Sequence, residues 1–323
     1  MRNGPLITGA DVQAAADALA RVVPFTPLIS CVDLAAEIGA AEVMLKLDSM
    51  QKGGAFKFRG AYNRIRLSLE EERPRRVVAY SSGNHGNAVA IAGEMFDLPC
   101  TVFIPKDISN YKRMALEERG ATLISYDRHV EDRVSMAEEY AIAEGAVLVP
   151  PFDDPSVIAG QGTSTLEVIN AGRTFDILIA PIGGGGLLAG NAVTAKELAT
   201  DDVLVYGAET TQTDAAARSL REGKIVTIPP PETFVDAMRK TAIGNEPWKV
   251  FSRYLDGVGV VGEEDVIEAL NYSLRILKLI VEPTSAVPLA ALLKGRIPVS
   301  GKRVLLIISG GNVTVEDLTN ILG

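Results

Sequence analysis

One lysine lies in a setting that suits covalent chemistry. Lys57 follows the pair Gly53-Gly54, is flanked by Phe56 and Phe58, and precedes a segment with helical spacing. Glycines let a ligand approach the backbone closely, and two aromatic rings can desolvate an amine and lower its pKa. Such an amine forms a Schiff base with a carbonyl compound. A lysine before an apolar helix is also often a solvated helix end, so other parts of the chain must decide.

Four consecutive glycines provide a candidate anion site. Gly183 to Gly186 follow an apolar segment at 177–181 and precede a predicted helix that starts at Leu187. Backbone amides at a helix start bind phosphate. The stretch also fits the loose dinucleotide fingerprint Gly-x-Gly-x-x-Ala, with Glu209 about 20 residues further on. Taken alone, the loop therefore predicts either a phosphate site or an NAD site.

Two polar loops complete the candidate site. The run from Ser81 to His85 separates a predicted strand from a predicted helix, and Ser309 follows another apolar strand. N-capping needs one polar residue, whereas this run holds several and contains a glycine, which favours a binding loop for a carboxylate. A lysine, a phosphate-binding loop and a polar group at a strand end together favour pyridoxal phosphate over a dinucleotide.

The elements that must position these residues alternate along the chain. Strands are predicted at 43–47, 77–80, 101–104, 122–126, 177–181, 203–208 and 304–308, and helices at 11–23, 56–69, 84–96, 111–119, 131–144, 157–170 and 187–198. This alternation predicts an α/β fold with mostly parallel sheets and flanking helices. The proline-rich segment 150–155 predicts a crossing between two lobes.

Composition excludes several classes of partner. The 323 residues carry a formal charge of −9, and no basic stripe or long apolar run is present. We therefore expect neither a nucleic-acid partner nor a membrane partner. The two cysteines, Cys31 and Cys100, do not form a C-x-x-C pair, and the N-terminus lacks a basic-then-apolar signal pattern. A reducing compartment, the cytoplasm, is the expectation.

Together these segments resemble the fold-type II pyridoxal-phosphate enzymes, in the branch of threonine and serine dehydratases, serine racemase and 3-hydroxyaspartate dehydratases. The matching motifs occur in the family's order at 54–61, 81–86, 151–155, 158–163, 183–186, 282–284 and 309–312. The resemblance implies a two-lobed fold of the tryptophan synthase β type. A small mobile lobe would span 50–148, and residues 1–49 with 149–323 would form the large cofactor-binding lobe.

The resemblance also implies roles for individual residues. Lys57 would hold the cofactor covalently, and Phe56 and Ser309 would contact its ring. Asn84 would bind its phenolic oxygen, and Glu282 would lie nearby. Its phosphate would be bound by Gly183, Gly184, Gly185, Gly186 and Leu187. The substrate carboxylate would be bound by Ser81, Ser82, Asn84, His85 and Arg133. For Arg133 and Glu282 a purely structural role stays an alternative.

The implied reaction is the α,β-elimination of a β-hydroxy amino acid to a 2-oxo acid and ammonia, with Lys57 as general base. Threonine, serine and 3-hydroxyaspartate are all candidate substrates, and a hydroxyectoine-pathway dehydratase is an alternative. Racemisation of serine or aspartate is a further alternative, because Ser82 would lie on the ring face opposite Lys57. A homodimer is the implied assembly.

A divalent cation such as magnesium stays open. Racemase-like relatives bind one through a glutamate, a carbonyl four residues later and an aspartate six residues later. Glu209 and Thr213 match the first two positions, but position 215 is alanine and Asp214 comes one place early. A hard cation needs several oxygen ligands in register. Glu209 is therefore either a metal ligand or simply an acid at a strand end.

Overall fold

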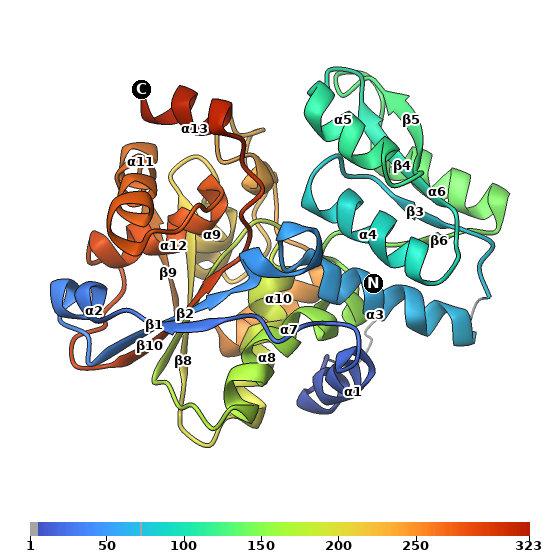
Figure 1. The fold of residues 1–323 in the computed structure, drawn as a ribbon. Helices are drawn as coiled ribbons and strands as arrows, with labels where there is room; N and C mark the ends of the chain where they lie inside the picture. The colour runs from blue at the N-terminus through green and yellow to red at the C-terminus, as the bar shows by residue number, and fades with distance from the viewer. Residues whose placement is uncertain (1–5, 72) are drawn as a thin grey trace.

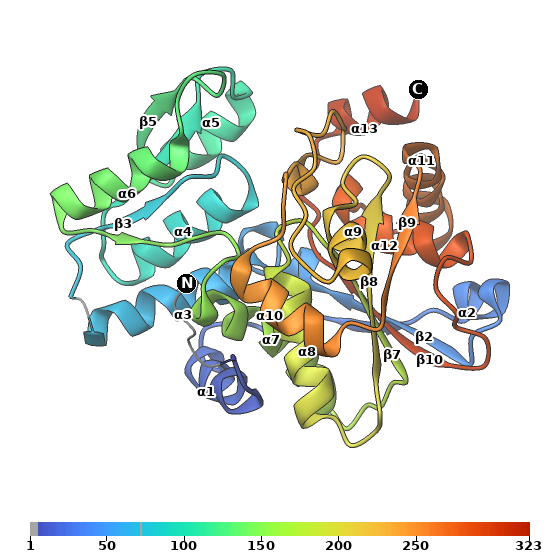
Figure 2. The same ribbon diagram turned by 180° about the vertical axis from the view of Figure 1, so that it is seen from behind.

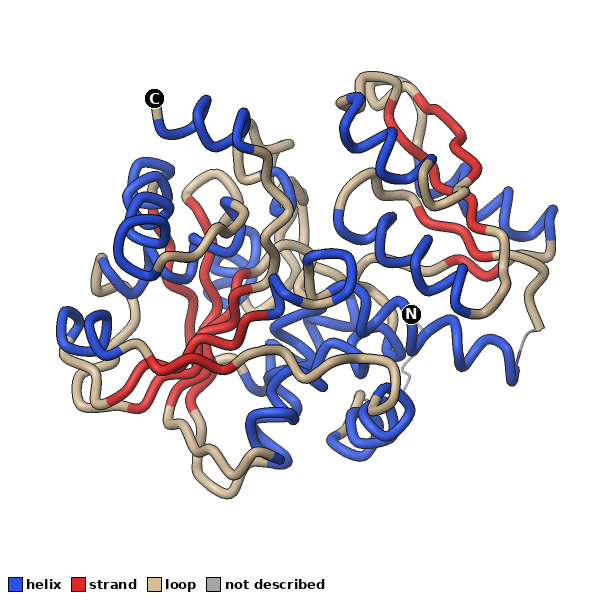
Figure 3. Tube along the Cα trace, in the orientation of Figure 1, coloured by secondary structure: helices blue, strands red, loops and turns tan. Residues whose placement is uncertain are grey.

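The computed structural model describes residues 6–71 and 73–323, so the first five residues of the predicted large lobe lie outside the described part. Two separate sheets, each flanked by helices, form two lobes (Figure 1). The larger sheet has six strands and the smaller has four. Figure 3 shows the two groups of strands well apart, with helices between them. The α/β prediction with mostly parallel sheets is confirmed.

The larger sheet has the order β1-β2-β10-β7-β8-β9 and is parallel except for β1. Its strands are β1 (Leu28–Ser30), β2 (Glu42–Leu47), β7 (Ile177–Pro181), β8 (Leu204–Thr210), β9 (Gly257–Val261) and β10 (Arg303–Ile308). The side chains of a strand alternate between two faces, and in β7 they enter two different apolar clusters. Both faces are therefore buried, which explains why these strands read as continuous apolar runs.

Helices cover both faces of this sheet. One face packs against α2 (Val32–Ile38), α11 (Glu263–Tyr272), α12 (Pro283–Leu293) and α13 (Val315–Leu322). The other packs against α1 (Gly9–Leu19), α7 (Pro155–Asn170), α8 (Gly186–Leu198), α9 (Ala215–Glu222) and α10 (Asn245–Tyr254). In Figure 2, where the molecule is turned by 180° from the view of Figure 1, α8 and α10 lie in front of the larger sheet.

The smaller sheet is entirely parallel and has the order β5-β4-β3-β6. Its strands are β3 (Val77–Ala79), β4 (Cys100–Pro105), β5 (Thr122–Tyr126) and β6 (Val147–Leu148). It is flanked by α4 (Asn84–Met95), α5 (Asn110–Glu117) and α6 (Arg133–Glu144). All its strands lie inside the predicted small lobe, whose exact limits stay a prediction.

Helix α3 (Lys57–Glu71) joins the two lobes, because it packs against α4 on one side and α7 on the other. Its approach to α7 requires glycine. A Cβ on Gly60 would lie 2.6 Å from the carbonyl oxygen of Val157, and one on Gly160 would lie 2.6 Å from that of Arg59. The first residue of this helix, Lys57, is therefore held by both lobes.

A buried group of charges lies beneath the start of α3. The Arg59 guanidinium is fully buried and donates to Asp48 at 2.9 Å and to Glu167 at 2.5 Å. Lys46 also donates to Glu167, at 2.5 Å, and Thr26 donates to Asp48 at 2.8 Å. These contacts connect α3 to β2 and α7. Burial alone would raise the pKa of Asp48, but the charge and hydrogen bond of Arg59, together with Lys46, lower it.

Several predicted helix bounds were wrong by two residues or more. Helix α7 begins at Pro155, before the predicted residue 157, because Asp154 accepts from the amide of Val157 and proline fits the first helical position. Helix α1 ends at Leu19, before the predicted residue 23. Helix α1 begins at Gly9, before the predicted residue 11, because Thr8 and Asp11 form a reciprocal capping box. Helix α6 begins at Arg133, after the predicted residue 131, because Asp132 caps it by accepting from the amide of Val134. In the described segments, no helix combines the length and apolar character that a membrane span requires.

Candidate active site

A cavity of about 540 Å³ is lined by residues of both lobes. It lies where α3, α4 and α8 begin and β10 ends, the strand-end position where open α/β sheets bind ligands. Its lining includes every residue predicted to bind cofactor or substrate. These residues are Phe56, Lys57, Ser81, Ser82, Asn84, His85, Arg133, Gly183 to Leu187, Glu282 and Ser309. The two predicted metal ligands are not part of the lining.

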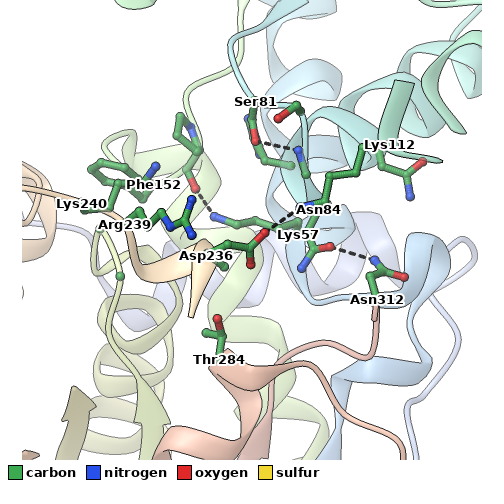
Figure 4. Close-up of a pocket in the computed structure, with 18 of the residues that line it drawn as sticks. Lys57, Ser81, Asn84, Lys112, Phe152, Asp236, Arg239, Lys240, Thr284 and Asn312 are labelled. Carbon is green, nitrogen blue, oxygen red and sulfur yellow. Dashed lines mark hydrogen bonds and ion pairs between the residues drawn. The ribbon is translucent and has the colours of Figure 1, made fainter. Parts of the chain in front are cut away.

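Lys57 is positioned from the large lobe as well as by its own helix. A β-bridge joins Ala55 to Gly310, and the amide of Phe56 donates to the carbonyl of Ser309 at 2.9 Å. The Lys57 amine donates to the carbonyl of Pro151 at 2.5 Å (Figure 4). Burial first, and then the charge of Lys240, lower its pKa to about 7, although Glu282 opposes the shift. A neutral amine at physiological pH is a competent nucleophile and base.

The glycine loop forms a narrow, uncapped helix start. Gly185 adopts φ of 99°, and no side chain caps α8. The Phe152 ring packs so closely that a Cβ on Gly184 would lie 2.2 Å from its Cδ1 atom. Amides that no side chain caps, at the positive end of a helix, suit a phosphate.

The loop 81–85 forms a second uncapped helix start. Gly83 is the N-cap of α4, and no side chain caps this helix. Asn84 donates to Glu282 at 2.8 Å and accepts from Asn312 at 2.8 Å, so it connects α4 to the large lobe. Burial raises the pKa of the Glu282 carboxyl to about 7, against the lowering effect of Asn84.

His85 is buried and neutral. Burial, followed by the charges of Lys57 and Lys240, lowers its pKa to about 3. Its Nε2 lies 2.7 Å from the carbonyl of Val149, which only accepts, so this nitrogen carries the proton. His85 therefore anchors the loop and has an unprotonated Nδ1 that lacks a protein partner.

Ser309 forms a hydrogen-bond chain with Ser285. The Ser285 hydroxyl lies 2.8 Å from the carbonyl of Gly310, accepts from the Gly310 amide, and lies 2.9 Å from the Ser309 hydroxyl. The Gly310 carbonyl also accepts from the amide of Glu282, so the proton between the two serines can lie on either hydroxyl. Ser285 therefore holds the Ser309 hydroxyl in place at the cavity wall.

Arg133 and Tyr80 lie together at the small-lobe side. The Arg133 guanidinium is 6.0 Å from the centre of the Tyr80 ring and donates to the hydroxyl of Tyr126 at 3.3 Å. Arg133 lines the cavity, as predicted for a carboxylate contact.

Several cavity residues were not anticipated. Lys112, Asp236, Arg239 and Lys240 all line it, and the ion pair between Lys112 and Asp236, at 2.6 Å, runs from α5 to η3 (Asp236–Met238). No local motif distinguishes these residues in the sequence. Lys112 lies on α5, and the other three lie in η3 or directly after it. Only the packing of the lobes brings them together.

The donor set around Glu209 does not fit a metal ion. Both carboxylate oxygens accept backbone hydrogen bonds, from the amides of Ala216 and Ala217 at 3.0 and 2.9 Å, so Glu209 binds the start of α9. In residues 6–71 and 73–323, no three acidic, histidine or cysteine side chains are arranged for metal binding. The alternative of a buried acid at a strand end fits this geometry.

Comparison with known proteins agrees with the site. The model of the family "Pyridoxal-phosphate dependent enzyme" matches residues 19–310. The chain is 36% identical over 312 residues to an L-threo-3-hydroxyaspartate ammonia-lyase of a Pseudomonas species, covering 97% of each protein. It is 35% identical over 320 residues to the serine racemase of Schizosaccharomyces pombe, covering 99% of this chain and 98% of that one.

The structure is also similar to that of maize serine racemase, with a TM-score of 0.92, 32% identity, and coverage of 98% of this chain and 97% of the other. The predicted fold and family branch are confirmed, and the ammonia-lyases among the relatives bear out the predicted reaction class. The dinucleotide alternative is thereby excluded. The chain belongs to the pyridoxal-phosphate dependent enzyme family.

Proposed function

We propose that this enzyme converts a β-hydroxy amino acid to a 2-oxo acid and ammonia by α,β-elimination. The observation that carries the proposal is the Lys57 amine, with a pKa lowered to about 7, in a cavity that also contains two uncapped helix starts. One helix start suits the cofactor phosphate and the other suits the substrate α-carboxylate.

The residues present fit pyridoxal phosphate. Lys57 would hold its aldehyde carbon, the amides of Gly183 to Gly186 with Leu187 its phosphate, Asn84 its phenolic oxygen, and Phe56 and Ser309 its ring. The tight, side-chain-free start of α8 and the position of the Ser309 hydroxyl in the cavity lining are the structural observations that support this assignment. Bound pyridoxal phosphate withdraws electrons from the α-carbon of the substrate and so acidifies its hydrogen.

The chain's own groups supply the rest. The substrate carboxylate binds at the start of α4, where Ser81, Ser82 and the amides of the loop face the cavity. The Lys57 amine, freed when the substrate amine takes its place on the cofactor, would take the α-hydrogen as a proton. The bond from the β-carbon to the hydroxyl breaks, and the hydroxyl leaves as water with that proton. The released enamine tautomerises to an imine, and hydrolysis with one water gives the 2-oxo acid and ammonia.

Release of 2-oxo acid and ammonia from separate stereoisomers of serine, threonine and 3-hydroxyaspartate tests the proposal. We expect equal amounts of both products from at least one substrate, and none from the variant Lys57→Ala. Protein that contains the cofactor and releases neither product from any of these substrates would refute the elimination.

Racemisation is the second candidate. Ser82 lines the same cavity as Lys57, and its hydroxyl forms no hydrogen bond within the described chain, so it is available to return a proton. Chiral chromatography of serine and aspartate after incubation tests this activity. Loss of inversion in Ser82→Ala, with elimination retained, is the expected result; equal inversion by both proteins would exclude this role.

The assembly and location follow from the family resemblance. We propose a homodimer in the cytoplasm, where the free thiols Cys31 and Cys100 remain reduced. We also propose that the small lobe, 50–148, closes over the substrate, supported by the ion pair of Lys112 with Asp236. Sedimentation equilibrium measures the mass of the assembly and so tests the homodimer. The mass of a single protomer at micromolar concentration would contradict it.

A further inference from the structure

Two cations face the cavity without an acidic partner. The side chain of Lys240 makes no hydrogen bond or ion pair within the described residues, and its amine lies 6.0 Å from the centre of the Phe152 ring. Within residues 6–71 and 73–323, the Arg133 guanidinium has a ring contact with Tyr80 and a hydrogen bond to the hydroxyl of Tyr126, but no ion pair. Burial first, and then the charge of Arg133, lower the pKa of Lys240 to about 8, against the effect of Asp236. The two cations therefore lie within electrostatic reach of each other.

Three acids that line the cavity near these cations already have other partners. Asp236 forms an ion pair with Lys112 at 2.6 Å. Asp132 caps α6 through the amide of Val134, and Glu131 accepts from the amide of Asp127. Two neighbouring, partly desolvated cations without a counter-ion are unfavourable, and an anion bound between them would relieve the cost.

Lys240 lies near the Phe152 ring, which packs against Gly184, and within electrostatic reach of the reacting groups. Its charge lowers the pKa of both Lys57 and His85, so it is within electrostatic range of the reacting amine and of the carboxylate loop. In Figure 4, Lys57 lies between Lys240 with Phe152 on one side and Asn84 with Asn312 on the other. If the proposed function is correct, the cofactor phosphate and the α-carboxylate already have binding sites at the starts of α8 and α4. The two cations are then available for a third anionic group.

We propose that Lys240 and Arg133 form a subsite for a second carboxylate, carried on the side chain of the substrate. The preferred substrate class is then the β-hydroxy amino dicarboxylates, of which 3-hydroxyaspartate is the smallest, over serine and threonine. This inference rests on the proposed function. The second carboxylate takes no part in bond breaking; it binds the cations and orients the α- and β-carbons relative to Lys57.

Binding without turnover tests the subsite separately from the reaction. 2-Methylaspartate and 2-methylserine lack the α-hydrogen, so the holoenzyme binds them without elimination, and the change in cofactor absorbance gives their dissociation constants. The variants are Lys240→Met and Arg133→Met. The matched control is Lys249→Met, because Lys249 lies on α10 and pairs with Glu246 outside the cavity lining.

We expect the wild-type enzyme to prefer the aspartate analogue, and each cavity variant to reduce that preference by at least about 30-fold, the low end for removing one member of a buried charge pair. Lys249→Met should keep the preference. Equal weakening of both analogues would overturn the proposal, since it would assign Lys240 to the cofactor phosphate. An absence of preference in the wild-type enzyme would also overturn it. Failure of elimination would leave these binding ratios measurable and would count against the proposed function alone.

Discussion

Replacement of Arg59 by methionine should destabilise the cofactor-free enzyme strongly. Methionine keeps much of the side-chain volume but removes the partner of Asp48, at 2.9 Å, and of Glu167, at 2.5 Å. Glu167 retains its ion pair with Lys46, whereas Asp48, which is fully buried, keeps one side-chain hydrogen bond among the described residues, from the hydroxyl of Thr26, and the more distant charge of Lys46. Removal of one partner from a buried ion pair costs about 3–5 kcal/mol, because the remaining charge is uncompensated.

Urea unfolding of the apoenzyme at pH 7 measures this cost, and Arg66→Met is the matched control. Arg66 lies on the same helix and pairs with the more exposed Glu70 at 3.1 Å. Loss of such a surface pair costs less than about 1 kcal/mol. If Arg59→Met lost no more stability than Arg66→Met, the buried charges would not be what holds the start of α3.

The same variant makes a prediction about pH. In the wild-type enzyme the pKa of Asp48 is lowered, chiefly by Arg59 acting against burial, so its contribution to stability is present above the unfolded pKa near 4 and is lost as pH falls through the folded value. Without Arg59, burial should raise the pKa of Asp48, and that penalty should grow as pH rises above about 4. The difference in unfolding free energy between the two proteins should therefore shrink on acidification, and a constant difference would refute the reasoning.

Three further predictions concern the site. Lys57 in the apoenzyme should react with trinitrobenzenesulfonate at half its maximal rate near pH 7, because burial and the charge of Lys240 lower its pKa to about 7. Peptide mapping by mass spectrometry identifies the labelled lysine, and a labelling rate that still rises up to pH 10 would contradict the lowered pKa. Magnesium should give no saturable heat in calorimetry and no change in the thermal midpoint, because both oxygens of Glu209 bind backbone amides; saturable binding that Glu209→Gln abolishes would restore the metal site. Ser285→Ala should remove a hydrogen-bond partner of Ser309, so the nitrogen-15 NMR signal of the labelled cofactor ring should shift from its wild-type position; an unchanged signal would show that Ser285 does not influence the contact of Ser309 with the ring.

The core of the site could be predicted because its parts are local. A glycine run between a strand and a helix has few structural uses, and four adjacent amides need no distant residue to form an anion site. Lys57, the loop 81–85 and Ser309 each follow or precede such an element, and the structure brings all of them to one cavity. Alternating apolar segments likewise predicted the parallel sheets, since both faces of each central strand had to be buried.

Tertiary structure decided what depends on contacts between distant segments. Asn84 and Glu282 are 198 positions apart, and no pattern in either segment announces their hydrogen bond. Lys240 is an ordinary lysine in a loop until packing places it near Lys57 and Arg133. Glu209 had two interpretations in the sequence, and only the folded chain shows that both of its oxygens accept from amides at the start of α9, which favours the structural one.

The physical reason for this division is the range of the interactions. Backbone conformation and hydrophobic periodicity are set by neighbouring residues, so the sequence by itself determined most of the elements and the positions of Lys57 and the glycine loop next to them. Burial and electrostatic environment are set by whichever segments pack together, so only the folded chain decided the pKa of Lys57, the hydrogen bond between Ser309 and Ser285, and which cations have no ion-pair partner among the described residues.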